Sequence, residues 1–338
     1  MKALIYTGAE TLEHGEAPAP ELRDGEALIR IEHVGICGSD MHAYLGHDER
    51  RPAPLILGHE AAGRIIEGPG AGKRVTINPL VTCGVCEACL SGRENICPHR
   101  QIISMPPREG AFAELLAMPP RNLVEIPDGV PTEKAALAEP IACGWHAVRL
   151  ARQVLGRPLA EARCLAIGGG AIGLGAALAL RAQGAGIGAG EITLAEPHAA
   201  RRSLIAESEG FRVVDPSGGA SPSDLGVADV DLVIDGVGYE ATRAFASAAV
   251  KPGGVIIHIG LGSGAGGLDI RRMTLQEIAF FGAYTYSAQD FRDTAAAIFD
   301  GRLGALDWPE IRPLASGAGA FADIKAGRVA APKIILQP

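Results

Sequence analysis

Four cysteines within fifteen residues constrain this chain more than any other feature. Cys83, Cys86, Cys89 and Cys97 follow the spacing C-x2-C-x2-C-x7-C, which can bring four thiolates to one point. Tetrahedral Zn²⁺ takes this set of ligands, and four protein ligands leave no position open for a substrate. We therefore predict a structural zinc in a lobe at about residues 80–98. The alternative, four reduced thiols without a metal, is disfavoured because such thiols in a loop are easily oxidised.

The bulk properties limit the class of protein. A length of 338 residues favours two domains, and the net charge of −8 comes without any run rich in Lys and Arg. We therefore predict no nucleic-acid partner and do not interpret the cysteines as a DNA-binding finger. The N-terminal sequence does not resemble a signal peptide, which favours a cytoplasmic location and metal ligation over disulfides.

One uncharged stretch, residues 164–180, approaches the length of a membrane span. It contains three consecutive glycines and is bordered by Arg163 and Arg181. A strand, a tight turn and a buried helix explain it better, so we predict no membrane partner.

The predicted pattern of secondary structure changes near Glu139-Pro140. The first ~135 residues alternate short apolar strands with Gly and Pro, which is typical of a β-rich and partly antiparallel domain. Strands and helices then alternate, which predicts a doubly wound parallel sheet of the Rossmann type. The predicted strands are 164–167, 191–195, 230–235 and 254–259, and the predicted helices are 171–183, 198–209 and 239–250.

The predicted domain boundaries follow from this change in the pattern of secondary structure. We predict a dinucleotide-binding domain at residues 142–283. The second domain combines residues 1–141 with 284–338, because a final apolar strand at 333–336 is expected to return to the first domain. The overall fold class is therefore α/β.

A glycine-rich turn follows the first predicted strand of the parallel sheet. Gly168-x-Gly170-x-x-Gly173 opens a helix, so its backbone N–H groups can receive a pyrophosphate. Glu196 ends the next strand, where a carboxylate accepts both ribose hydroxyls and repels a 2′-phosphate, so NAD is favoured over NADP. Arg201 and its neighbour Arg202 argue against a strict preference for NAD, because guanidinium groups there could bind the 2′-phosphate of NADP. The remaining predicted cofactor contacts are Ala171, Ile172, Gly236 and Leu261.

A second group of ligand types lies upstream of the four cysteines. Cys37, His59 and Glu60 offer a thiolate, an imidazole and a carboxylate, a set that binds catalytic zinc and leaves room for a substrate oxygen. Asp40 could brace His59 through its second ring nitrogen. Ser39 and His42 offer a hydroxyl and an imidazole as a path for a proton to solvent.

Together these motifs resemble the medium-chain zinc-dependent alcohol dehydrogenases, and they span nearly the whole chain in the order of that family. Glu139, where the simple alcohol dehydrogenases carry cysteine, is similar to the sorbitol and related polyol dehydrogenases. The motifs are Cys37-Gly38-x-Asp40-x-His42, Gly58-His59-Glu60-x-x-Gly63, the four-cysteine lobe, Glu139-Pro140 and the nucleotide glycines.

The resemblance implies a GroES-like catalytic domain, two zincs per chain and a homodimer or homotetramer. It implies a catalytic zinc held by Cys37 and His59, with Glu60 or Glu139 completing the ligands directly or through water. Ser39 would be the relay hydroxyl and His42 its exit to solvent. Cys143, one helical turn after Glu139, could compete as a ligand, although a small buried residue explains it more simply.

The reaction so implied is hydride transfer between NAD(H) and a secondary alcohol, with a polyol or sugar alcohol as the small-molecule substrate. Two alternatives stay open: another small alcohol (an amino alcohol, a diol or a simple alcohol) and a non-enzymatic nucleotide-binding descendant. The loop 47–51 could contact a polyol, although a solvated loop is the simpler interpretation. The predicted pocket wall consists of Tyr44, Phe112, Glu139, Leu261 and Tyr286.

Overall fold

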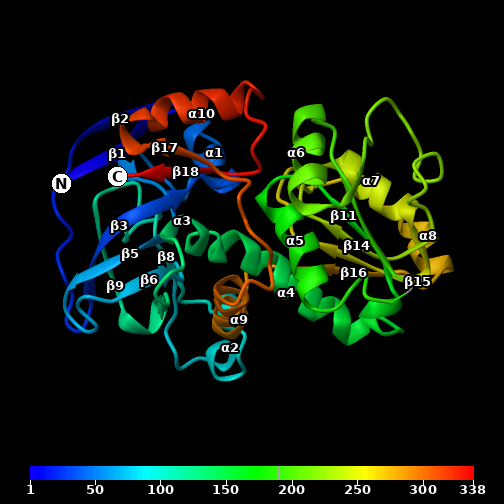
Figure 1. The fold of residues 1–338 in the computed structure, drawn as a ribbon, viewed down its shortest axis with the longest axis horizontal. Coiled ribbons are helices and arrows are strands. Elements are labelled where there is room, and N and C mark those ends of the chain that lie inside the picture. Colours follow the sequence, from blue (N-terminus) through cyan, green and yellow to red (C-terminus); the bar gives the residue numbers. More distant parts are fainter. Residues whose placement is uncertain (189) are drawn as a thin grey trace.

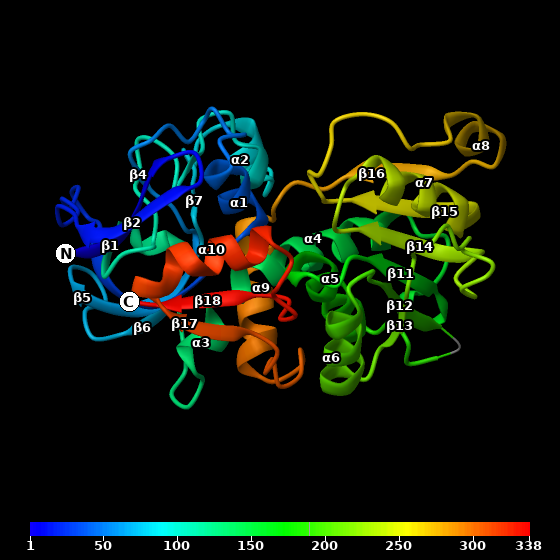
Figure 2. The ribbon, with the colours of Figure 1, turned by 90° about the horizontal axis from the view of Figure 1, so that it is seen from above.

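The computed structural model describes residues 1–188 and 190–338. It has two lobes side by side, a β-rich lobe that holds both chain termini and an α/β lobe (Figure 1). Two helices, α4 (Ala138–Val154) and α9 (Ala288–Phe299), lie between the lobes, as the second view also shows (Figure 2). Position 189, within the glycine-rich segment 184–190, lies outside the described residues.

The α/β lobe contains a six-stranded parallel sheet in the order β13-β12-β11-β14-β15-β16. The order reverses between β11 and β14, and ligands of such sheets bind at the carboxyl ends of the strands at this point. The strands are β11 (Arg163–Ile167), β12 (Glu191–Ala195), β13 (Arg212–Val214), β14 (Val230–Asp235), β15 (Val250–His258) and β16 (Ala279–Gly282). The helices are α5 (Ala171–Ala182), α6 (Ala199–Glu209), α7 (Glu240–Ala249) and α8 (Ile270–Leu275), with a 3₁₀ turn η3 (Leu159–Glu161).

Successive side chains of a strand point to opposite faces of the sheet, so the core of this lobe has two parts, one on each face. Leu232 and Ile234 of β14 pack in one cluster with α4 and α5, whereas Val233 packs in another with α7 and α8. β11 is buried on both faces in the same way, with Cys164 and Ala166 in the first cluster and Leu165 in the second. Together with the largely buried helix α5, this explains the uncharged stretch 164–180 in the sequence. No helix among the described residues is both long and apolar enough to cross a membrane.

The β-rich lobe is built on a mixed sheet in the order β10-β6-β5-β3-β18-β17, with β9 paired to β3. The C-terminal strand of the chain, β18, belongs to this sheet and pairs antiparallel with β3 through Ile335 and Gly35. The strands of the lobe are β1 (Lys2–Gly8), β2 (Thr11–Glu16), β3 (Ala27–Gly35), β4 (Leu55–Ile56), β5 (Glu60–Glu67), β6 (Arg74–Ile77), β7 (Leu80–Val81), β8 (Gln101–Ile102), β9 (Leu115–Met118), β10 (Leu123–Glu125), β17 (Glu310–Pro313) and β18 (Ile334–Gln337). Its helices are α1 (Gly38–Tyr44), α2 (Glu87–Leu90), α3 (Thr132–Ala135) and α10 (Gly317–Lys325), with 3₁₀ turns η1 (Glu94–Ile96), η2 (Pro120–Asn122) and η4 (Leu314–Ser316).

The predicted fold class is confirmed, with a parallel doubly wound sheet and a separate β-rich lobe. Sequence patterning did not identify β13 and β16, because edge strands of three and four residues are too short to show an apolar period. The predicted boundary at 141/142 falls inside α4, and the one at 283/284 lies one residue beyond the end of β16. These domain boundaries stay predictions.

A buried carboxylate joins α9 to α4. Asp290 accepts hydrogen bonds from Arg149 Nε at 2.6 Å and from the Ser287 hydroxyl at 2.7 Å, and it lies 2.8 Å from His146 Nδ1. Burial alone would raise the pKa of Asp290, but the hydrogen bonds from His146, Arg149 and Ser287 outweigh burial and hold this pKa below its ordinary range. The carboxylate thus fixes the helix that carries Glu139.

Asp290→Asn is expected to lower the free energy of unfolding at pH 7 by about 2–3 kcal/mol, because hydrogen bonds to a buried charge are lost. The folded-state pKa lies below the unfolded one of about 3.9, so this stabilisation is complete above that value and is lost as the pH falls through the folded-state pKa. Urea unfolding should show a difference from wild type that is equal at pH 7 and 5 and smaller at pH 3. A difference that is the same at all three pH values contradicts the expectation.

Candidate active site

The four cysteines of the predicted zinc lobe converge on one point. Cys83, Cys86 and Cys89 lie before and within α2, and Cys97 follows η1. Their sulfurs are separated by 3.5 to 3.8 Å in four pairs. A regular tetrahedron with Zn–S bonds of about 2.3 Å requires sulfurs roughly 3.8 Å apart. The arrangement therefore fits one zinc ion without rearrangement.

The protonation of these thiols also favours a cation. Hydrogen bonds from the backbone N–H groups of Val85 and Cys86 lower the pKa of Cys83 to about 6. The backbone N–H of Cys89 lowers the pKa of Cys86, but burial and the neighbouring thiols outweigh it and raise that pKa to about 11. Four adjacent thiolates repel one another, so a bound cation is what allows all of them to ionise.

The second group of ligands meets at the junction of α1 and β5. Cys37 caps the N-terminus of α1, and His59 and Glu60 lie at the start of β5. One potential ligand atom from each lies within 4.8 Å of the others. The turn before them requires glycine, because Gly58 has a φ of +89° and a Cβ there would lie 2.5 Å from the ring of Phe112.

Glu60 offers one carboxylate oxygen to this group. Its Oε1 accepts a hydrogen bond from Lys333 Nζ at 2.6 Å, and Lys333 also donates to the carbonyl of Ile36 at 2.8 Å. Its Oε2 is buried and has no hydrogen-bond partner among the described residues. An unpaired buried carboxylate oxygen is costly unless a cation satisfies it. Cys37, His59 and Glu60 therefore fit a zinc ion, with Lys333 orienting the carboxylate.

The orientation of His59 depends on two further residues. Its Nδ1 lies 3.4 Å from Asp40 Oδ1 and 3.4 Å from the hydroxyl of Ser104. Asp40 is fully buried and also accepts hydrogen bonds from the backbone N–H groups of Cys37 and Gly58. Asp40 thus lies where the sequence analysis expected a brace for His59, whereas Ser104 and Lys333 were missed. A single lysine beside an apolar strand was the only sequence signal for Lys333.

Glu139 lies near this group but outside it. Its carboxylate Oε1 accepts a hydrogen bond from the Tyr286 hydroxyl at 2.6 Å. Burial raises the pKa of Glu139 to about 7, with His59 opposing the rise and Glu60 adding to it. Neither Glu139 nor Cys143 belongs to the group of close ligand atoms found among the described residues.

The predicted relay residues lie on one short helix. Ser39 and His42 are three positions apart on α1, so their side chains share a face. The loop before β4 contributes to the same region, because Arg51 is only 3% exposed and contacts Ser39. The interpretation of the whole loop 47–51 as solvated is therefore wrong for Arg51.

Two residues of the predicted pocket wall belong to the core of the β-rich lobe. Tyr44 and Phe112 pack against Phe321, with ring centroids 5.2 and 5.9 Å apart. Both are buried and complete this aromatic core. Their place in the pocket wall stays a prediction.

The glycine-rich turn has the geometry that a dinucleotide site requires. Gly168 has a φ of +97°, and a Cβ on Gly173 would lie 1.9 Å from the Gly168 carbonyl. A Cβ on Gly236 would lie 2.8 Å from the Gly173 nitrogen, so these three glycines allow β11, α5 and the end of β14 to pack closely. A Cβ on Gly170 would meet nothing within 4 Å. Open space at Gly170 allows a pyrophosphate to approach Ala171 and Ile172 at the start of α5.

Glu196 follows β12 and Arg201 lies on α6, and the side chains of both already have hydrogen-bond partners. Glu196 is buried and accepts hydrogen bonds from the backbone N–H groups of Gly169 at 2.6 Å and His198 at 2.7 Å. Arg201 donates to the carbonyls of Val329 and Ala330 at 2.9 and 3.1 Å. The Arg201 side chain therefore connects the α/β lobe to the segment that precedes β18.

The same C-terminal segment connects the two predicted sites. The backbone N–H of Ala171, at the start of α5, donates to the carbonyl of Pro332 at 3.2 Å. The next residue, Lys333, binds Glu60. The glycine-rich turn and the Cys37 group are thus joined through two adjacent residues. Leu261 follows β15 and is 73% exposed at the carboxyl edge of the sheet.

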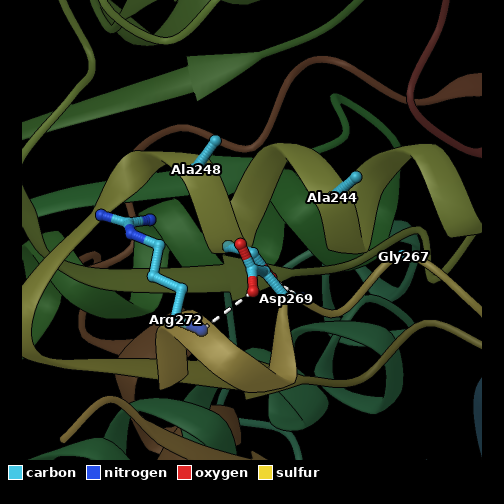
Figure 3. A pocket seen from close by; sticks show the side chains of 6 residues that line it. Ala244, Ala248, Gly267, Asp269 and Arg272 are labelled. Carbon is cyan, nitrogen blue, oxygen red and sulfur yellow. Dashed lines mark hydrogen bonds between the residues drawn. The ribbon is translucent and has the colours of Figure 1, made fainter. Parts of the chain in front are cut away.

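A surface hollow of about 450 Å³ lies elsewhere, between α7 and α8 (Figure 3). It includes none of the predicted ligand or cofactor residues, and its two charged side chains, Asp269 and Arg272, belong to the N-cap and first turn of α8. The hollow therefore does not compete with the Cys37 group as the active site. Its lining residues are Ala244, Ser247, Ala248, Gly267, Asp269 and Arg272.

Two groups of zinc ligands and a dinucleotide-binding turn in one chain define a zinc-dependent dehydrogenase that uses a nicotinamide cofactor. Comparison with known families supports this class. Residues 23–128 match the alcohol dehydrogenase GroES-like domain, and residues 171–300 match the zinc-binding dehydrogenase domain. The chain belongs to the medium-chain zinc-dependent alcohol dehydrogenases, which are oxidoreductases that act on alcohol groups. The predicted resemblance is confirmed.

Individual relatives are similar over most of their length. L-galactonate-5-dehydrogenase of Escherichia coli K12 is 32% identical over 316 residues, which cover 90% of this chain and 89% of the relative. Sorbitol dehydrogenase of Bacillus subtilis 168 is 33% identical over 302 residues, which cover 85% and 83%. Among solved structures, one described as a zinc-binding dehydrogenase of Sinorhizobium meliloti 1021 bound to NADP has a TM-score of 0.88 at 26% identity and covers 100% of this chain and 99% of its own.

Proposed function

We propose that this protein catalyses the reversible oxidation of a secondary hydroxyl of a polyol or sugar alcohol with NAD. The observation that carries the proposal is the buried, unpaired Oε2 of Glu60 beside Cys37 and His59. It supports a metal at a point that Lys333 and Pro332 link to the dinucleotide turn.

Two zincs per chain are part of this proposal. Cys83, Cys86, Cys89 and Cys97 would hold the structural ion. Cys37, His59 and Glu60 would hold the catalytic one, and the position of Glu139 supports a contact through water rather than direct ligation. A zinc held by these three residues would supply Lewis-acid chemistry toward a substrate oxygen.

The side chains around this site have separate roles in the proposed reaction. Lys333 orients the Glu60 carboxylate, and Asp40 orients the imidazole of His59. Ser39 accepts the proton that leaves the substrate hydroxyl, and His42, one turn further along α1, passes it to solvent. Gly168, Gly170 and Gly173 would receive the cofactor, the N-terminus of α5 would bind its pyrophosphate, and Gly236 and Leu261 would complete the binding site.

Glu139 supports a substrate with several hydroxyl groups. Its buried carboxylate and the hydroxyl of Tyr286 form a hydrogen-bonding pair beside the ligand group, where a second hydroxyl of a polyol can bind. Relatives named for sorbitol and L-galactonate point to the same class of substrate.

A substrate panel tests the proposed function. Uncharged polyols, sugar acids, amino alcohols, diols and simple alcohols are offered with NAD and with NADP, and reduced cofactor is measured by absorbance. We expect turnover of polyols or sugar acids with NAD. Turnover of unbranched hydrophobic alcohols alone would overturn the polyol assignment, and a fully metallated protein inactive on the whole panel would favour a non-enzymatic descendant.

The choice of NAD over NADP rests on Glu196. Glu196→Ala is expected to relax the preference against NADP by roughly tenfold or more, because a buried carboxylate no longer repels the 2′-phosphate. The ratio of kcat/KM for the two cofactors measures this change. Glu196→Gln is the control, since its amide retains one acceptor for the Gly169 N–H without the charge. An unchanged ratio in both variants would remove Glu196 from ribose recognition.

The proposal also includes the assembly of the protein. A homodimer or homotetramer agrees with the outer edge of β16, which pairs only with β15 among the described strands. We also propose a cytoplasmic location, a dinucleotide-binding domain at 142–283 and a catalytic domain formed by 1–141 and 284–338.

A further inference from the structure

Arg51 is a buried cation next to the proposed relay hydroxyl. Its side chain is 2% exposed, although the residue lies in a loop rich in charged residues. Its Nε donates to the carbonyl of Ser104 at 3.0 Å, and its Nη1 donates to Asp48 Oδ2 at 2.8 Å. A buried guanidinium is costly unless such partners satisfy it, so these contacts fix its position.

The rest of the guanidinium contacts one residue twice. Nη1 donates to the backbone carbonyl of Ser39 at 3.2 Å, and Nη2 lies 3.5 Å from the Ser39 hydroxyl oxygen, at the outer limit of a hydrogen bond. Ser104, which Arg51 also holds, lies with its hydroxyl 3.4 Å from His59 Nδ1. Arg51 therefore connects the first turn of α1 to the segment behind His59.

We propose that Arg51 is a positioning residue that fixes the Ser39 hydroxyl for proton transfer. The inference rests on the proposed function and adds to it a residue that does not touch the substrate. An N–H donated to the Ser39 oxygen uses one of its lone pairs, so the hydroxyl proton must point away from Arg51 and the other lone pair is left for the substrate. Holding both the carbonyl and the hydroxyl of Ser39 restricts its side chain to this orientation.

The neighbouring arginine offers a matched control. Arg50 binds the same Asp48 through Nε and Nη2 at 2.8 and 2.9 Å, but its side chain is 65% exposed and no hydrogen bond to Ser39 is found in the described structure. Arg50→Lys thus changes the same loop and the same carboxylate without reaching the relay.

The test combines kinetics with hydrogen exchange in four variants: Arg51→Lys, Arg50→Lys, Ser39→Ala and the Arg51→Lys/Ser39→Ala double variant. Arg51→Lys keeps the charge but cannot hold Ser104, Asp48 and Ser39 together. We expect kcat to fall about 10–100-fold with the KM for NAD unchanged, because the relay is misplaced. Arg50→Lys should leave kcat unchanged. In the Ser39→Ala background, Arg51→Lys should change kcat less than about twofold.

Hydrogen exchange of the zinc-loaded protein gives a readout that does not depend on activity. Peptides covering 38–44 should exchange faster in Arg51→Lys than in wild type and Arg50→Lys. If wild type turns over no alcohol, the proposed function fails, whereas this measurement still reports on the contact between Arg51 and Ser39. Unchanged exchange would overturn the inference. So would effects of Arg51→Lys and Ser39→Ala that multiply independently, because they would indicate a merely structural role.

Discussion

Cys37→Ser is expected to abolish alcohol turnover, by at least about 10³-fold in kcat/KM, while the protein folds and binds NADH as wild type does. A serine hydroxyl is a poor zinc ligand, so the group formed with His59 and Glu60 loses its thiolate and the substrate oxygen loses its electrophile. A 10³-fold loss corresponds to about 4 kcal/mol of transition-state stabilisation. Cys37 lies at the N-cap of α1 and is partly exposed, so its loss should cost little folding free energy.

The measurements for this variant are zinc content, NADH fluorescence and turnover of the best substrate from the panel. Zinc should fall from two ions per chain to one, and the Kd for NADH should stay within about twofold of wild type. Cys143→Ala is the matched control, since it removes a buried thiol one turn from Glu139 that is outside the ligand group. If Cys37→Ser retains two zincs and substantial activity, Cys37 is not a catalytic ligand.

Cys97→Ser is expected to act on stability instead, with a fall in Tm of roughly 10 °C or more. The lobe around it has few apolar contacts and exposes Val85 and Leu90, so the free energy of metal coordination replaces a core. Activity measured well below the new Tm should be reduced less than in Cys37→Ser. The lobe is not isolated from the site, because Asn95 donates to the Tyr284 carbonyl at 2.7 Å, two residues before Tyr286.

Calorimetry with zinc analysis tests this expectation. Cys164→Ala is the control, because Cys164 is equally buried but lies in β11 away from either metal group. That control should keep two zincs and lose far less stability than Cys97→Ser. A Cys97→Ser protein with the melting behaviour of wild type, or one that has lost only its activity, would contradict the division into a structural and a catalytic zinc.

The parallel sheet could be predicted from the sequence because its central strands are short, mostly apolar segments that are followed by glycine or end near an acidic residue. β11, β12 and β14 lie within one residue of the predicted ranges, and the helix after Gly170 begins at Ala171 as expected. The edge strands were not predictable, since β13 and β16 are held by pairing to a neighbour rather than by their own pattern.

In the candidate site too, some residues could be predicted from the sequence and others could not. The residues with metal-binding chemistry could be identified from local patterns, because C-x2-C-x2-C-x7-C and the pair His59-Glu60 have ligand types that follow from side-chain chemistry. The partners that orient these residues became visible in the three-dimensional fold. Lys333 and Glu60 are 273 positions apart in the sequence, and Tyr286 and Glu139 are 147 positions apart. Arg51 lies in a loop rich in charged residues, but its side chain is turned inward and donates to Ser39. These partners come together because their side chains are buried and because the C-terminal strand pairs with β3. The spacing of neighbouring residues in the sequence contains no information about either.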